Sequence, residues 1–269
     1  MYVTQASPPL GPYADTLLHI AAQAIGIFTI DFPDPYAIDY DNNKFDTLND
    51  SVSFQYRILS NIQTLSTKGV DSGTDPYGIL YVPDLHTDAC RQQEQEQNRV
   101  PANATRLADL PQGKNYALIA VAPWYSAQCT IEYLASARQA PTKAFFTYQP
   151  GQSNAKPPVL NDASWNLQDG GSWQTANSFP TYALSSMTGN NIMTQLNLYS
   201  GNLTHVPFGD QLAQEYNTTD YVRLWASVNT GESWSHRSPA VSNLGRLWWP
   251  TSELMGFPRY RPSNPPPRR

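Results

Sequence analysis

Charged residues are scarce in this 269-residue chain and make up 14% of the sequence. The 22 acidic residues outnumber the 17 Lys and Arg, which leaves a net charge of −5. Because nucleic acid binding depends on a basic surface that contacts phosphates, this balance argues against a nucleic acid partner. Proline is abundant, at 23 residues, and the low charge together with many prolines indicates a β-rich protein with long loops.

Long apolar runs are also missing. No stretch of about 18 apolar residues occurs, so we expect membrane contact only through a segment that this chain does not include. Residues 16–30, TLLHIAAQAIGIFTI, are apolar, but no Lys or Arg precedes them. This segment is either a buried strand or helix that packs on the domain, or a degenerate secretion signal.

Known catalytic signatures are absent from the sequence. It has no H-E-x-x-H, no G-x-S-x-G and no G-x-x-x-x-G-K-[ST]. The four histidines are scattered. Asp84, His86 and Asp88 alternate along one segment, but a loop before a cysteine explains them as well as a metal site does. We therefore expect neither enzyme activity nor a cofactor.

Only two cysteines are present, Cys90 and Cys129, so one disulfide is possible. It would close a loop of about 40 residues, which the chain-entropy model values at roughly 4 kcal/mol. The alternative is two buried free thiols in a cytosolic protein. Glycosylation sequons favour the disulfide, because both features are typical of the secretory lumen or the exterior. The sequons lie at Asn49, Asn103, Asn202 and Asn217.

The central part of the chain has the pattern of a strand, a helix and a second strand. Tyr116–Ala122 is a short, continuous apolar run, which is typical of a strand covered on both faces. Thr130 is predicted to cap a helix that ends before Pro141. Ala144–Tyr148 then reads as a second strand, and two strands joined by a helix favour parallel pairing.

The flanking segments give further predictions. Strands are expected at Ser51–Ser60, Gly78–Val82, Phe179–Leu184 and Asp220–Val228. A helix should follow Ser185 or Ser186 and be interrupted at Gly189. Thr64–Pro76 is expected to be a polar loop, and Cys90–Arg106 an exposed excursion.

Gln149–Asn177 is a long segment with several Pro and Gly residues and two tryptophans, Trp165 and Trp173. Two indoles are costly to leave in water. Either the segment folds back as a lid on the core, or it offers an aromatic surface to a partner or a sugar.

Three segments together resemble the protease-associated domain: Gly78–Cys90, Ala117–Tyr148 and Phe179–Arg223. The resemblance covers about Ser51–Val228 and is greatest to the lumenal domain of fungal proteins that carry this domain, a transmembrane helix and a RING finger. Two turns differ: PWYSAQ stands where the family has an Arg-Gly type turn, and PTKA where it has Gly-Ala.

The resemblance implies an α+β fold, a β-sandwich or open barrel with flanking helices and long loops. It would occupy residues 51–230. Residues 1–50 would be an N-terminal extension that packs on the domain, and residues 231–269 an irregular tail rich in Pro, Arg and Trp.

The resemblance also implies a non-catalytic module that recognises proteins or peptides as cargo or substrate, in the secretory lumen, the vacuole or outside the cell. Two cysteines cannot form a RING, which needs eight zinc ligands. The alternatives are the module of a secreted peptidase whose catalytic domain is absent, and a carbohydrate-binding protein that uses Trp165, Trp173 or Trp225. Candidate ligand loops contain Pro123, Trp124, Tyr125, Trp165 and Trp173.

Overall fold

The computed structural model describes residues 22, 24–32, 48, 53–69, 75–110, 116–216 and 221–230. All of them belong to one compact unit, Met1–His236. The predicted tail, residues 231–269, lies outside the described residues.

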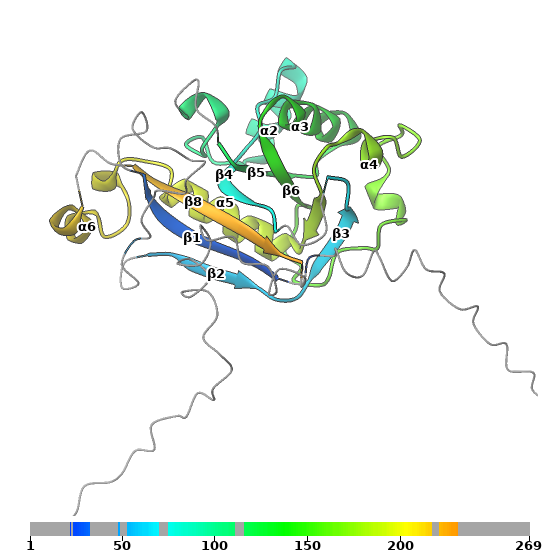
Figure 1. Cartoon of the computed structure of the whole chain (residues 1–269). Helices are drawn as coiled ribbons and strands as arrows, with labels where there is room; N and C mark the ends of the chain where they lie inside the picture. Colours follow the sequence, from blue (N-terminus) through cyan, green and yellow to red (C-terminus); the bar gives the residue numbers. More distant parts are fainter. Residues whose placement is uncertain are drawn as a thin grey trace, which may run out of the picture. The chain divides into compact units, whose positions relative to one another are not determined.

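The described residues form eight strands and five α-helices (Figure 1). The strands are β1 (Ala24–Phe32), β2 (Gln55–Ile58), β3 (Ile62–Ser66), β4 (Tyr77–Tyr81), β5 (Leu118–Pro123), β6 (Thr142–Tyr148), β7 (Thr181–Leu184) and β8 (Tyr221–Asn229). The helices are α2 (Asp88–Gln97), α3 (Ala127–Gln139), α4 (Trp173–Ala176), α5 (Ser186–Leu198) and α6 (Gly209–Glu215), with short 3-10 turns at Leu107–Asp109, Ala163–Trp165 and Leu203–His205. Within the described part of the chain, no helix has both the length and the hydropathy needed to cross a bilayer.

All eight strands belong to one mixed sheet with the order β2-β1-β8-β4-β5-β6-β7-β3. Strands β4, β5, β6 and β7 are parallel to one another, and the remaining pairs are antiparallel. The prediction of a mixed helix and strand fold is confirmed in this form.

The sheet is rolled, because its two edge strands follow each other in the chain. In a flat sheet, seven strand spacings of about 4.8 Å would hold β2 and β3 about 34 Å apart. Ile58 and Ile62, which end β2 and begin β3, are four peptide steps apart, at most about 14 Å. A bond between opposite ends of the sheet agrees with this: the Ala22 amide, just before β1, donates to Thr64 Oγ1 of β3 at 3.3 Å.

Helices cover both faces of the parallel strands. The Thr142 hydroxyl of β6 donates to the Ala137 carbonyl of α3 at 2.8 Å, on one face. Tyr148 at the other end of β6 packs against Gly189 of α5. Leu118 and Pro123 of β5 are an odd number of residues apart, so their side chains face opposite sides of the sheet. They pair with Thr142 and Tyr148, which therefore also face opposite sides. Accordingly, α2 and α3 lie together over β5 and β6, with α5 on the other side (Figure 1).

The predicted strand, helix and strand at the centre of the chain are confirmed as β5, α3 and β6, with parallel pairing between the strands. The predicted start of the helix is wrong. It begins at Ala127, because Ser126 Oγ accepts a hydrogen bond from the Cys129 amide at 3.3 Å and caps the first turn. Thr130 is a buried residue inside the helix.

Two segments predicted to be irregular contain regular elements. The predicted excursion at Cys90–Arg106 begins with α2, whose residues are almost all polar and whose buried residue is Cys90. The predicted loop at Thr64–Pro76 begins inside β3, which pairs with β7. In both segments, partners distant in sequence supply the stabilisation that local hydrophobic periodicity does not indicate.

The apolar segment of residues 16–30 contributes β1, one of the two alternatives that its sequence allows. This strand lies in the interior of the sheet and pairs along all nine of its residues with β8. Residues that we assigned to an N-terminal extension therefore form part of the sheet itself. The predicted interruption at Gly189 is wrong, because α5 continues through it to Leu198.

Candidate functional site

Helices α2 and α3 begin side by side, and a side-chain hydroxyl caps the first turn of each. We take these two helix starts as the candidate site. Thr87 Oγ1 accepts from the Cys90 amide at 3.4 Å at the start of α2. Ser126 Oγ accepts from the Cys129 amide at 3.3 Å at the start of α3. Each cysteine is the third residue of its helix, so the pattern Ser/Thr-x-x-Cys occurs twice. Hydroxyl caps of this kind stabilise the free amides of a first helical turn.

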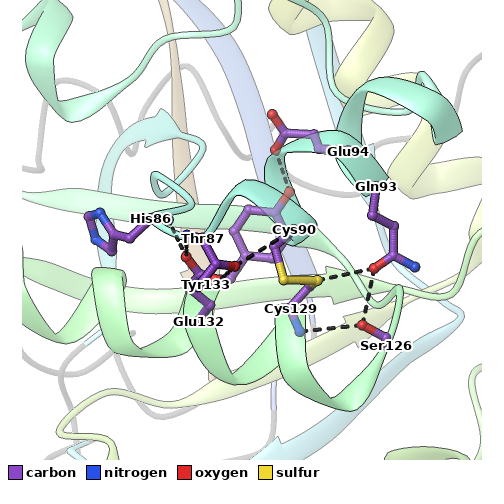
Figure 2. The surroundings of a disulfide bond; sticks show 9 residues. All are labelled: His86, Thr87, Cys90, Gln93, Glu94, Ser126, Cys129, Glu132 and Tyr133. Atoms are coloured by element: carbon purple, nitrogen blue, oxygen red, sulfur yellow. Dashed lines mark hydrogen bonds between the residues drawn. A yellow bond between two sulfur atoms is a disulfide. The ribbon is translucent and has the colours of Figure 1, made fainter.

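A disulfide joins these two first turns, as predicted, with 5.4 Å between the Cα atoms of Cys90 and Cys129. Both cysteines are buried. Gln93 of α2 reaches across to α3, and its Oε1 accepts from the Ser126 hydroxyl at 3.1 Å (Figure 2). The same oxygen lies 3.0 Å from Cys129 Sγ. The disulfide and Gln93 fix the spacing of the two helix starts.

Glu132 of α3 stabilises the start of α2 from the outside. Its carboxylate accepts from the amides of His86 and Thr87, the latter at 2.5 Å, and from the Thr87 hydroxyl at 2.7 Å (Figure 2). Partial burial acts to raise the pKa of Glu132, but the hydrogen bonds from Thr87 and His86 outweigh it and lower the pKa. The negative charge also offsets the two positive helix ends that meet here.

A second carboxylate connects both helices to the end of β4. The Tyr133 hydroxyl of α3 donates to Glu94 of α2, and Arg106 donates to the other Glu94 oxygen at 2.7 Å. Arg106 also donates to the Pro83 carbonyl, just after β4, at 2.8 Å. Burial and the Glu94 carboxylate raise the pKa of Tyr133, so this hydroxyl stays protonated as a donor.

The segment of residues 98–106 runs past the carboxyl end of β4. The Val82 amide at the end of β4 donates to the Thr105 carbonyl at 2.9 Å. On the α5 side, Asn103 Nδ2 donates to the Asn197 carbonyl at 2.6 Å and the Thr105 hydroxyl to Ser200 Oγ at 2.9 Å. The segment therefore connects the helices on one face of the sheet to the helix on the other.

Three tryptophans pack together beside this edge. The rings of Trp165 and Trp173 meet the ring of Trp124 edge-on, at centroid distances of 5.1 and 5.5 Å. Trp124, Trp165 and Trp173 are 7%, 2% and 3% exposed. Trp165 Nε1 donates to the Pro158 carbonyl at 3.0 Å. The segment of residues 149–177 thus folds back on the core.

The candidate ligand residues have unequal access to solvent. Pro123 ends β5 and is buried, as are the three tryptophans, whereas Tyr125 is half-buried. Trp225 is also buried and stacks on Tyr77 at 5.6 Å. All four described indoles are therefore covered by protein and do not form a platform for a sugar ring.

Two of the four sequons lie within the described residues. Asn103 is exposed and uses one of its two Nδ2 hydrogens for the bond to Asn197, which leaves the other free. Asn202 is half-exposed, and its Oδ1 accepts from the amide and the hydroxyl of Thr204, both at 3.0 Å. Asn49 and Asn217 lie outside the described residues.

Of the three residues that alternate around the start of α2, Asp88 and His86 have contacts of another kind. Asp88 forms an ion pair with Arg91 on the helix surface, and His86 contributes its amide to Glu132. Across the described ranges, no three His, Cys, Asp or Glu side chains come together as a metal site would require.

No family model matches the sequence, and no curated protein matches it. The resemblance to the protease-associated domain therefore stays a prediction.

Proposed function

We propose that this chain is a non-catalytic module of the protease-associated type, which binds proteins or peptides in the secretory lumen, the vacuole or outside the cell. The observation that carries the proposal is the covalent connection between the starts of α2 and α3 at the carboxyl ends of parallel strands. Ligands of open α/β sheets commonly bind at this end of the strands.

The position of the resembling segments supports the fold assignment. Gly78–Cys90 contains β4 except for its first residue, Ala117–Tyr148 contains β5, α3 and β6, and Phe179–Arg223 contains β7, α5 and the start of β8. In space these strands form the uninterrupted run β8-β4-β5-β6-β7. The rolled single sheet favours the open-barrel form of the family over a sandwich of two sheets.

The proposed compartment is supported by covalent chemistry. Disulfides persist in oxidising compartments and are rare in the cytosol. The exposed side chain of Asn103 suits a modification that occurs in the same compartments.

The binding surface that we propose is the rim formed by the Pro123–Gln128 loop and the start of α3. Buried tryptophans support this loop from behind, and the disulfide fixes its far end. A loop held at both ends loses little conformational entropy when a ligand binds, which favours affinity.

The test is capture of lumenal proteins by the secreted, disulfide-bonded chain, with covalent cross-linking and identification by mass spectrometry. Tyr125→Ala should reduce capture, because Tyr125 lies in the proposed loop. Tyr221→Ala is the matched control, since Tyr221 is an exposed tyrosine at the start of β8. Equal capture by both variants, or by the reduced and alkylated chain, would contradict the proposal.

A further inference from the structure

Three polar groups that are buried at the carboxyl ends of the parallel strands have a donor hydrogen that is not used among the described residues. They are Arg99 Nε, Tyr125 Oη and Tyr148 Oη. Buried polar groups are nearly always satisfied, and an unsatisfied one lowers stability, so each of these atoms needs an explanation. We call these three residues the Arg–Tyr cluster.

Backbone geometry brings the cluster together from three elements. Tyr148 is the last residue of β6 and pairs with Pro123, the last residue of β5. The Trp124 amide donates to the Tyr148 carbonyl at 2.8 Å, which places Tyr125 one residue beyond this bond. Arg99 follows α2, and its guanidinium is close enough to Tyr125 and Tyr148 to lower the pKa of both hydroxyls.

The position of the Tyr148 ring is fixed by α5. A Cβ atom on Gly189 would lie 2.0 Å from Cγ of Tyr148, so the helix backbone rests directly on the ring. Tyr148 has no exposed surface, whereas Arg99 and Tyr125 are half-exposed. The cluster therefore has a fully buried end at Tyr148, whereas Arg99 and Tyr125 have other atoms at the surface, although their Nε and Oη atoms are buried.

The cluster contains one cation without an ion-pair partner among the described residues. Arg106 is paired with Glu94, but Arg99 has no ion pair among the described residues. Burial raises the pKa of Tyr148, and the nearby Arg99 guanidinium opposes that shift. Burial and the Glu94 carboxylate likewise raise the pKa of Tyr125, against the charges of Arg99 and Arg106 and a hydrogen bond from the Arg99 backbone. In that bond the Tyr125 oxygen accepts, so its own O–H hydrogen remains available. Both phenols are therefore neutral hydrogen-bond donors beside a cation.

All three unsatisfied atoms are able to donate hydrogen bonds, and the Arg99 Nε–H can only donate. The complementary group is an oxygen that accepts several bonds and carries negative charge. A carboxylate has these properties, and its bonds to Arg are among the strongest in proteins.

We propose that Arg99, Tyr125 and Tyr148 form a binding site for a carboxylate group of a protein or peptide ligand. This proposal rests on the proposed function and specifies the chemistry of its ligand. The carboxylate enters between Arg99 and Tyr125 and accepts its innermost hydrogen bond from Tyr148. It comes either from the C-terminus of the ligand or from an Asp or Glu side chain.

The test uses three peptides and the full chain labelled with 15N. The probes are N-acetyl-Ala-Ala-Ala with a free C-terminus, the same peptide as the amide, and N-acetyl-Ala-Glu-Ala-amide. The readout is the NMR signal of the Arg99 Nε–H group, assigned with Arg99→Lys. We expect this signal to shift with at least one of the two carboxylate peptides and not with the uncharged amide. A shift with the first peptide alone identifies a C-terminal ligand, and a shift with the third identifies an acidic side chain.

Tyr148→Phe and Tyr182→Phe form a matched pair of variants. Each removes one buried hydroxyl that has no partner among the described residues, but Tyr182 lies in β7, outside the cluster. Tyr148→Phe should weaken carboxylate binding roughly 10- to 100-fold, as expected for one bond to a charged group. Tyr182→Phe should leave binding unchanged. Because neither hydroxyl is bonded to the described protein, both variants should fold normally.

The proposal is overturned if no peptide shifts the Arg99 signal at millimolar concentration, if the amide peptide acts like the acids, or if both Phe variants bind equally well. Its failure is distinguishable from failure of the proposed function. Protein capture that Tyr148→Phe leaves unchanged would overturn the carboxylate site alone. Carboxylate binding that is lost in Tyr148→Phe, without any protein capture, would uphold the site and remove the proposed function.

Discussion

Gly189 of α5 lies against the ring of Tyr148 of β6, so closely that a Cβ atom at this glycine would be 2.0 Å from Cγ of the ring. The absence of a side chain allows α5 to approach the sheet. It also fixes the ring whose hydroxyl forms the buried end of the Arg–Tyr cluster.

Gly189→Ala should therefore destabilise the protein, although alanine favours helix formation by about 1 kcal/mol over glycine. Forcing extra volume into a packed contact costs typically about 1–3 kcal/mol. The 2.0 Å separation from Tyr148 Cγ places this case at the upper end of that range, above the gain in helix propensity. Urea unfolding measures the difference. Gly201→Ala is the control, since no atom lies within 4 Å of a Cβ added there. A Gly189→Ala protein more stable than the wild type would contradict the observed packing.

Removing the disulfide should strongly destabilise the protein. Its cysteines are 39 residues apart in sequence, and the chain-entropy model gives about 4 kcal/mol for a loop of that length. We expect the Cys90→Ala/Cys129→Ala protein to lose that amount in denaturant unfolding under non-reducing conditions. The wild type with added reductant should show a similar loss. A change below about 1 kcal/mol would mean that the disulfide does not constrain the unfolded chain as proposed.

Acid should weaken the contact between Glu132 and the start of α2. The folded-state pKa of Glu132 lies below its ordinary value of 4.5. The charged carboxylate therefore contributes stability above about pH 4.5, and this contribution is lost as the pH falls through the lower, folded-state pKa. Unfolding free energies from pH 7 to pH 3 should converge for the wild type and Glu132→Gln. Glu96→Gln, on the exposed side of α2, controls for the loss of charge. A constant difference between the wild type and Glu132→Gln over this range would rule out this role.

Trp165 should act through stability and not through ligand contact. Its ring is 2% exposed and packs edge-on against Trp124. Trp165→Ala should cost about 3–5 kcal/mol, as is typical for a large aromatic residue in a core. Trp165→Phe should cost less, because it keeps most of the packing. Its remaining cost includes the lost hydrogen bond to the Pro158 carbonyl. If Trp165→Ala folds with wild-type stability but captures fewer partners, then residues 149–177 are a binding surface instead of a lid.

Local sequence signals were sufficient to identify β5, α3 and β6, but not to place the start of α3. The continuous apolar run from Tyr116 and the proline at position 141 mark the strand and the end of the helix without reference to distant residues. The predicted start of α3 is wrong because Ser126, four residues before Thr130, supplies the capping hydroxyl. The Ser-x-x-Cys pattern, matched by Thr-x-x-Cys before Cys90, was the signal that would have located both helix starts.

Partners that are distant in sequence explain what was missed. Helix α2 is polar, and its stability comes from the disulfide and from Glu132, which lies 45 residues after Thr87. The place of β1 in the sheet depends on pairing with β8, at the opposite end of the described chain. The Arg–Tyr cluster unites residues next to α2 and β5 with the last residue of β6, and no motif connects them.

The most direct test of the account is the covalent state of the protein isolated from the cells that naturally make it. The measurement is mass spectrometry of peptides after alkylation of the denatured chain, with and without prior reduction, together with release of N-linked glycans. We predict that Cys90 and Cys129 are alkylated only after reduction and that Asn103 or Asn202 carries a glycan. Alkylation of both cysteines without reduction, with no glycan on either asparagine, would contradict the proposed compartment and remove the main support for a secreted interaction module.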